Sequence, residues 1–406
     1  MHLIRVLIFI LISNIVLSED FIYSGFSLQG KFSHNEINYP MFSKFLKEDN
    51  EINKKLFQIM QNEKGLIIQK SSDDKGLVVS FGLLTENMNL TNINNTIKNE
   101  FILYPQVFIY DNDSKNFLGS KSARLSFMTK SSLENTNHDQ SLYNAYKSLI
   151  LDPEPKISFI DECTERQIIK TSFLNIYKIL FNCISLKEEE KFNIQIRNIN
   201  FDNTNLIKFF SHNYDKSLSK DALTYKLANI ATNATSDKTN SNYFIVLPYS
   251  KEQSIARVQN RFSDTKNLNI KLPESDFSID IKFKGLLKKL LKEDLDQDMY
   301  GYGLGLNYKI IEPYSNTTIF EGDFKYFKPQ IFPKDKSGNS NLHSSQSDSY
   351  FYLQIYEELL AKISSHILKE ELSRDDKEFL KKWSNNQDSY NKIVQNHKKI
   401  VETFFK

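Results

Sequence analysis

The chain has 406 residues, of which 25% are charged and 40% are hydrophobic, and its formal net charge is +2. A chain of this length can form two or three globular domains that each bury a core of their own. The near-zero net charge argues against nucleic acid as a partner, because phosphate binding normally requires an excess of basic residues on one face.

The first 18 residues have the pattern of a signal peptide. Arg5 precedes an apolar run from Val6 to Val16, and small or polar residues follow up to Ser18. The run is shorter than the ~20 residues that a membrane-spanning helix needs, so a retained anchor is the weaker alternative. We therefore expect cleavage near Ser18, no integral membrane span in the mature chain, and an exported protein that is periplasmic or secreted.

Residues 19–155 are predicted to form a first α+β unit. Residues 101–111 read as a strand, residues 111–115 as a polar turn and residues 116–129 as the returning strand. A polar loop then leads into a helix over residues 141–151, which ends before two prolines. The apolar face of this helix is formed by Leu142, Tyr146 and Leu149.

Residues 156–218 are predicted to connect this unit to a second one through a helix and a strand. The chain has two cysteines, Cys163 and Cys183, and Thr164 is a suitable N-cap for a helix between them. A helix of about 18 residues would be ~27 Å long, whereas a disulfide needs Cα atoms within ~7 Å. We therefore expect a continuous helix with unpaired thiols, and the alternative is a disulfide with a broken helix. The apolar face of the helix would be formed by Ile169, Phe173, Ile176 and Leu180.

Residues 219–372 are predicted to form a second α+β unit with the order α–β–α–β–β–β–α. Its hairpin, polar loop and amphipathic helix repeat the arrangement of residues 101–151, so we expect two related units. The pattern predicts an α/β sandwich in which helices cover one face of a mixed sheet. The predicted elements are a helix after Ser219, a strand at 243–249, a helix at 254–262, strands at 277–285, 302–312 and 317–327, and a helix at 350–372.

Residues 373–406 are predicted to form a helical tail. Ser373 and Asp376 have the spacing of a capping box, which marks the start of a helix. The apolar stripe of the tail is a candidate partner-docking surface, and folding of this stripe back onto the second unit is the alternative. The residues proposed for docking are Ile393, Ile400 and Phe404.

Three glycines alternate with larger residues in the stretch MYGYGLGLNYKII, residues 299–311. A dinucleotide-binding loop requires GxGxxG between a strand and a helix. Here the spacing is GxGxG and the alternation continues without a following helix, which predicts a strand with one bare face. The glycines of this face are Gly301, Gly303 and Gly305.

No catalytic, cofactor-binding or metal-binding residues are predicted. The acidic stretch from Asp294 resembles the start of a calcium loop, but Met299 and Gly305 stand where that loop needs glycine and glutamate. We therefore expect an acidic hairpin turn. The histidines form no HExxH pair, and His366 lies near the apolar stripe of its helix, where a packed or hydrogen-bonded role is expected. The stretch GFSLQG at 25–30 lacks the spacing and the setting of a nucleophile elbow.

The second unit resembles a recurrent domain of the bacterial envelope. The resemblance is carried by the runs DFSIDIKFKG, YGYGLGLNYKIIEPYSNTTIFEGDF and YLQIYEELLAKISSHIL within residues 219–372. They are similar to the domain shared by the curli secretion channel lipoprotein, the N-terminal domain of TolB and flagellar basal-body proteins of the periplasm. The lipid-anchoring cysteine of the curli protein and the propeller of TolB have no counterpart here. The resemblance implies a periplasmic, non-catalytic module that docks other envelope proteins.

Three functions are compatible with these patterns. The first is a non-enzymatic envelope scaffold or assembly factor, for example of a secretion or flagellar-type machine, which binds other envelope proteins and forms homo-oligomers if it binds itself. The second is a secreted surface glycoprotein of an AT-rich eukaryote, with most of its glycosylation sequons occupied. The third is a hydrolase whose site is assembled from residues far apart in the sequence. The sequons begin at Asn89, Asn94, Asn112, Asn233 and Asn316.

Overall fold

The structure of the chain is a computed structural model. The predicted signal peptide, Cys163 and parts of both predicted polar loops lie outside the residues that it describes. The described residues are 21–29, 38–48, 51–64, 67–68, 75–93, 96–132, 138–154, 157–161, 167–184, 191–211, 219–236, 243–250, 255–260, 268–334 and 345–405.

The first sheet combines strands of the N-terminal half with two strands from the middle of the chain. Its strands are β1 (Ile22–Gln29), β2 (Ile67–Ile68), β3 (Leu77–Ile93), β4 (Thr96–Asp111), β5 (Phe117–Ser122), β6 (Leu125–Ser132), β11 (Ile255–Asn260) and β12 (Leu268–Lys271). β1 is parallel to β3, β3 is antiparallel to β4, and β5 and β6 are both antiparallel to β4. β2 and β11 pair with β1, and β12 pairs with β11.

The second sheet repeats the core of this topology. Its strands are β9 (Phe192–Phe201), β10 (Phe244–Leu247), β13 (Phe277–Glu293), β14 (Gln297–Glu312) and β15 (Thr317–Pro333), in the order β10-β9-β13-β14-β15. β9 is parallel to β13, and the antiparallel pairs β13–β14 and β14–β15 follow. Each half therefore has a first strand, helices, a second strand parallel to the first, and then antiparallel strands. This correspondence is consistent with two related units.

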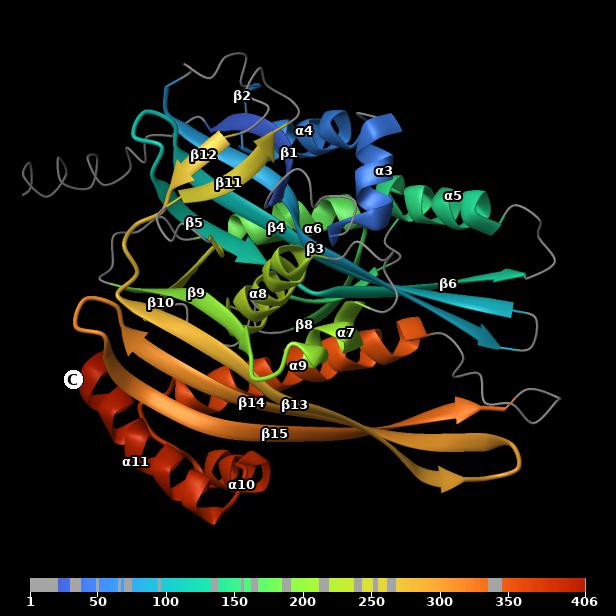
Figure 1. Cartoon of the computed structure of the whole chain (residues 1–406). Coiled ribbons are helices and arrows are strands. Elements are labelled where there is room, and N and C mark those ends of the chain that lie inside the picture. Colours follow the sequence, from blue (N-terminus) through green and yellow to red (C-terminus); the bar gives the residue numbers. More distant parts are fainter. Residues whose placement is uncertain are drawn as a thin grey trace, which may run out of the picture.

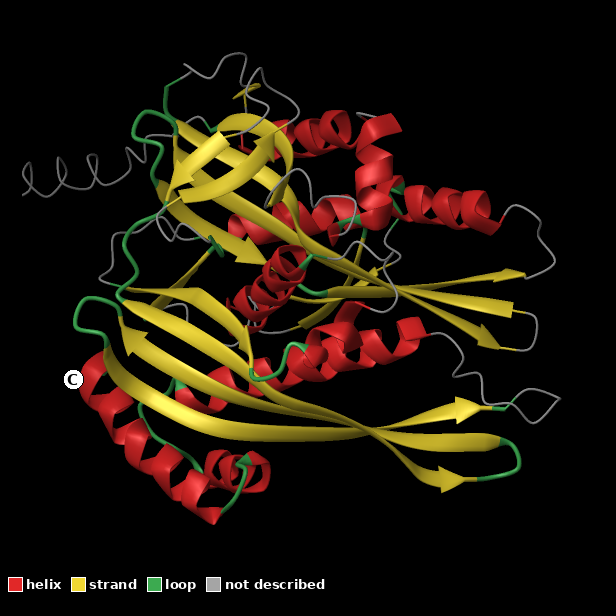
Figure 2. Cartoon of the chain, viewed as in Figure 1, coloured by secondary structure: helices red, strands yellow, loops and turns green. Residues whose placement is uncertain are grey.

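The helices and the two sheets form alternating layers (Figure 1). Helices α3 to α6 share a core with the first sheet, α8 and α9 lie between the sheets, and α10 and α11 pack along β15 (Figure 2). The remaining small elements are the antiparallel hairpin β7–β8 and helix α7. The bounds are Pro40–Glu48 (α3), Glu51–Lys64 (α4), His138–Leu151 (α5), Ile157–Asp161 (β7), Gln167–Thr171 (β8), Phe173–Asn182 (α6), Asn205–Ser211 (α7), Lys220–Ser236 (α8), Ser345–Ile367 (α9), Arg374–Trp383 (α10) and Gln387–Phe404 (α11).

The predicted fold class is confirmed. The chain is an α+β protein with mixed sheets, and it ends in a helical tail that begins with the capping box at Ser373. The glycine stretch lies within strand β14, as its alternation predicts. In addition to its own helices, the first sheet has α8 and α9 against its other face, because the two halves are stacked.

The continuous helix predicted after Thr164 is wrong. Strand β8 occupies Gln167–Thr171, and α6 begins only after its N-cap Ser172. The isoleucines of this segment fit a helical stripe and a strand equally well, and pairing with β7 decides the outcome. Cys183 is disulfide-bonded, so the prediction of unpaired thiols is also wrong and the alternative with a broken helix holds.

Two further predicted elements differ. The helix predicted at 254–262 is strand β11, which pairs with the open edge of β1. The strand predicted at 116–129 is interrupted at Ala123 and Arg124, so that β5 and β6 pair with successive parts of β4. Both differences depend on a distant strand that offers hydrogen-bonding partners, which local periodicity does not reveal.

Candidate interaction surface

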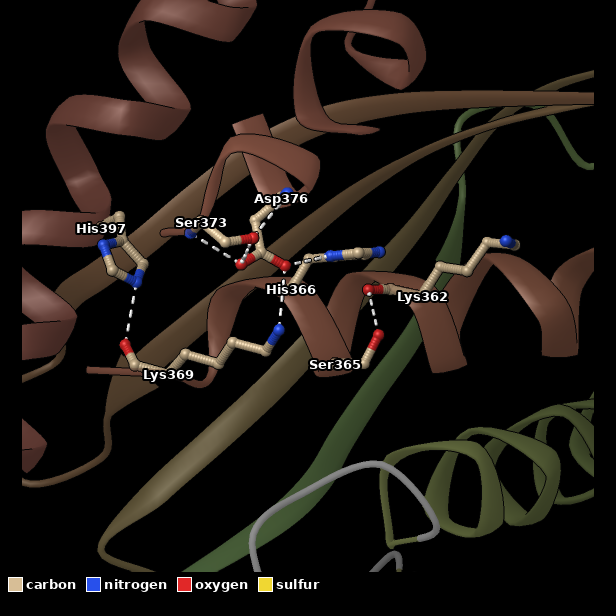
Figure 3. Close-up of polar contacts among 7 residues, drawn as sticks. All are labelled: Lys362, Ser365, His366, Lys369, Ser373, Asp376 and His397. Carbon is tan, nitrogen blue, oxygen red and sulfur yellow. Dashed lines mark hydrogen bonds and ion pairs between the residues drawn. The ribbon is translucent and has the colours of Figure 1, made fainter. Parts of the chain in front are cut away.

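The clearest cluster of polar side chains lies where α9 is followed by α10 (Figure 3). The Asp376 carboxylate accepts hydrogen bonds from the Ser373 hydroxyl (2.6 Å), the Ser373 backbone N–H (2.8 Å) and the Lys369 ammonium (2.9 Å). His366 Nδ1 also bonds this carboxylate, and its ring stacks on Phe379 at a centroid distance of 4.2 Å. The expected hydrogen-bonded role of His366 is thus confirmed.

This cluster contains serine, histidine and aspartate, but its connections are those of a helix cap. In a catalytic triad the histidine would accept the serine proton, and the aspartate would hold the far side of the histidine. Here Ser373 and His366 both bond Asp376, and the Asp376 N–H donates to Ser373 Oγ at 3.1 Å. Burial raises the pKa of Asp376, but its hydrogen bonds outweigh burial and hold the pKa well below its usual range. The cluster fixes the start of α10.

A second polar region joins the two halves. β3 and β4 shift register between Leu83 and Glu86, and the bulge leaves carbonyls without ladder partners. Asn229 of α8 donates to the Leu84 carbonyl at 2.8 Å, and Lys226 of α8 donates to the Glu86 carbonyl at 3.4 Å. These side chains from the second half satisfy backbone groups of the first.

Two buried carboxylates lie in this joint. Glu357 of α9 accepts hydrogen bonds from Tyr104 (2.6 Å) and Arg124 (3.0 Å) of the first half. Glu86 accepts from the backbone N–H groups of Met41 and Phe42 at the start of α3, at 3.1 Å each. Burial raises the pKa of Glu86 to about 7, although these bonds and the nearby Lys226 oppose the shift. Both carboxylates are enclosed and serve to connect elements.

The second sheet ends in a three-stranded arm, which has α9 against one face. We define the arm as residues 284–293 of β13, 297–305 of β14 and 325–333 of β15; it projects to the right in Figure 1. In the body of the sheet, the face turned away from the helices is charged and polar. Arg197 binds Asp280 there at 2.9 Å, and Asn307 donates to Asp323 at 2.8 Å.

The outer face of the arm has exposed apolar side chains in addition to Lys289 and Lys325. The side chains opposite Gly303 are Leu287 and Phe327, with exposed fractions of 51% and 38%. Ile331 lies farther along β15 and is 54% exposed. A Cβ atom on Gly301 would lie 1.9 Å from Phe327 Cζ, so the Phe327 ring occupies the space that a side chain at position 301 would need. The alternation in the sequence predicted the glycine face, but this patch was not predicted; its signal was the apolar pairs in GLLKKLLK.

The inner face of the arm is anchored to α9. Tyr302 donates to Asp348 at 2.6 Å, and Lys288 forms an ion pair with the same carboxylate at 2.8 Å. Phe332 packs edge-on against Phe351 with ring centroids 5.4 Å apart. Burial, and then the hydrogen bond to Asp348, raise the pKa of Tyr302 well above its usual value, so the phenol stays a donor. One face of the arm is therefore fixed, and the other is exposed.

The three tail residues proposed for docking are buried in the second core. Ile393 and Ile400 are fully buried, and a Cβ atom on Gly322 would lie 2.8 Å from Ile393. The Phe404 ring packs edge-on against Phe277 at a centroid distance of 4.4 Å. Docking through these side chains would require α11 to leave the sheet, and it remains a prediction.

The predicted sequons differ in their surroundings. Asn233 is fully buried in α8 and accepts a hydrogen bond from Ser122 at 2.7 Å, and Asn112 is buried as well. Asn316 lies in the exposed turn between β14 and β15 with φ of 54°. The side chains of Asn89 and Asn94 are not among those that the structure describes. A glycan on Asn233 would not fit between the halves, and with the burial of Asn112 two of the five sequons are incompatible with this packing.

Two structural features are absent from the described part of the chain, namely a cluster of metal ligands and a helix that could cross a membrane. No group of three or more histidine, cysteine, aspartate or glutamate side chains there could hold a metal ion. None of the helices within the described ranges combines the length and the hydropathy that a membrane crossing requires.

Comparison with known proteins gives only partial likenesses of fold. No protein-family model matches the chain, and no curated protein matches it. Protein XCC0632 of Xanthomonas campestris, from family DUF330, is 6% identical, with 43% of this chain and 83% of that chain covered at a TM-score of 0.24. A neuraminyllactose-binding hemagglutinin homolog of Helicobacter pylori is 10% identical, with 48% and 90% covered at a TM-score of 0.23. A minor lipoprotein of Acinetobacter baumannii is 15% identical, with 23% and 68% covered at a TM-score of 0.16. These are bacterial proteins, and TM-scores this low assign no function to the chain.

Proposed function

We propose that the protein is a non-enzymatic, exported envelope protein that acts as a scaffold or assembly factor through protein–protein contacts. The observation that carries this proposal is the outer face of the arm. Leu287, Phe327 and Ile331 are exposed there, whereas the same face of the sheet is charged and polar closer to the body. Exposed apolar patches of this kind mark contact surfaces. The setting that we favour is a secretion or flagellar-type machine of the periplasm.

The test is capture of the partner by the tagged full-length protein from its native cells after mild cross-linking. The arm variant carries Leu287→Ser, Phe327→Ser and Ile331→Ser. The control variant carries Leu118→Ser, Met128→Ser and Tyr314→Ser, which remove exposed large side chains away from the arm. We expect the wild-type protein and the control to capture the same envelope protein, and the arm variant to lose it. Equal capture by all three proteins would refute the docking role of the arm.

A further inference from the structure

The β13 side of the arm is an unpaired strand edge. β9 pairs with β13 only as far as Phe283, and within the described residues no other strand lies beside Gly285–Glu293 on that side. Gly285–Leu290 pairs regularly with β14 between two register shifts. Alternate N–H and C=O groups of such an edge point outward and can hydrogen-bond an additional strand.

The opposite edge of the arm is closed to such addition. Pro329 and Pro333 of β15 have no N–H group to donate. Closer to the body, Phe324 of β15 already forms a bridge with Ser384, at the end of α10. Prolines and covering segments are the usual means by which proteins protect a sheet edge. Among the described residues, Gly285–Leu290 of β13 has neither a proline nor a covering strand, and its protection consists of Lys288, Lys289 and the flanking register shifts.

Charge determines which strands the β13 edge can accept. Residues 282–292 contain five lysines and no acidic residue, and four of these lysines form ion pairs with aspartates elsewhere in the chain. Lys289 lies opposite Gly301 on the outer face of the arm, and it forms no ion pair with any described residue. Antiparallel addition of a second copy would bring lysines close to lysines, and like charges in facing positions destabilise a strand pair. An acidic strand would instead place carboxylates beside the lysines.

We propose that this edge binds an extended acidic segment of a partner protein, which adds as a fourth strand beside Gly285–Leu290. Its backbone bonds the free edge, and its carboxylates lie on the outer face of the arm beside Lys289, which is two residues from Leu287 on the same face. This inference rests on the proposed docking role of the arm and names the chemical class of the partner segment.

The experiment uses fluorescein-labelled octapeptides and fluorescence anisotropy with the full-length protein. The first peptide alternates valine and glutamate, the second alternates valine and lysine, and the third is the first with every backbone nitrogen methylated, so that neither edge of it can donate hydrogen bonds. We expect only the first to bind. Lys289→Glu should weaken its binding at least about five-fold, consistent with cross-strand charge pairs. Lys399→Glu, an equal charge change on the exposed side of α11, should leave binding unchanged.

Equal binding of the methylated peptide would show that the edge is not used, and it would overturn the proposal. Equal binding of the lysine peptide would overturn the role of charge. Binding to vesicles of anionic phospholipid without peptide binding would assign the lysines to a lipid surface instead. In each of these cases, loss of partner capture by the arm variant would still support the docking function, so the two proposals fail separately.

Discussion

At the scale of single residues, the glycines of β14 differ in what they accommodate. Gly301→Ala would place a Cβ atom 1.9 Å from Phe327 Cζ, whereas a Cβ on Gly305 would meet nothing closer than 3.7 Å. We expect Gly301→Ala to displace the exposed Phe327 ring and to be destabilising, at less than the ~1–3 kcal/mol of overpacking a buried core. Gly305→Ala, the matched control, should be neutral or stabilising by about 0.5 kcal/mol, because alanine has less backbone freedom to lose. Urea unfolding measures the free energy of unfolding of both variants. Equal changes in the two variants would contradict the described packing of Phe327.

Glu86 predicts a dependence of stability on pH. Its pKa is about 7 in the folded chain against a usual 4.5, so the folded state keeps the proton to higher pH than the unfolded state. The stability contribution of this group therefore falls as the pH rises from 4.5 through 7, by about 3 kcal/mol in total. Because glutamine does not titrate, the unfolding free energy of Glu86→Gln relative to wild type should increase over this range.

The measurement is urea unfolding of both proteins at several pH values between 4.5 and 8. Glu402→Gln, which removes a carboxylate from the exposed side of α11, is the matched control. A constant difference between Glu86→Gln and wild type across this range would show that Glu86 titrates normally and is not enclosed as described.

At the scale of elements, the C-terminal helix α11 is part of the second core. Phe404→Ala should lower the free energy of unfolding by about 3–5 kcal/mol, the usual cost of removing a buried aromatic ring. Lys399→Ala on the exposed side of the same helix should change it by less than about 0.5 kcal/mol. Thermal unfolding and partner capture, measured on the same variants, distinguish a role of these residues in the core from a role in docking. Unchanged stability with lost capture would favour docking through Ile393, Ile400 and Phe404.

The elements also show which features the sequence could predict. Strands β14 and β15, helix α9 and the capping box at Ser373 follow from long periodic patterns and a local hydrogen bond, and they were predicted. β8 and β11 are short, and their apolar residues fit a helix or a strand, so distant strands decide their conformation. The apolar patch of the arm was missed for a similar reason. Leu287 lies on the face turned away from the helices because of its register with β14 after the shift between Phe283 and Gly285, which local sequence does not encode.

At the scale of the whole molecule, the two halves are interlocked. The chain leaves the second sheet after β10, contributes β11 and β12 to the first sheet, and then returns as β13. Side chains of α8 also satisfy the carbonyls of the β3 bulge. The joint combines hydrogen bonds between the halves with an apolar cluster that brings Tyr350 of α9 against Leu84, Ile102 and Tyr104, so the halves have little to gain from separating. A structure of this kind should unfold as one unit although it contains two cores.

We therefore expect a single calorimetric transition, with a van't Hoff enthalpy close to the calorimetric enthalpy. Glu357→Gln weakens the joint, because the Tyr104 and Arg124 donors lose their charged acceptor; this should cost about 2 kcal/mol. These hydrogen bonds join the two halves, so their loss destabilises both halves together. The single transition should therefore move to lower temperature without splitting. Two separate peaks, in wild type or in the variant, would show that the halves are independent domains, and only the peak of the less stable half would then shift.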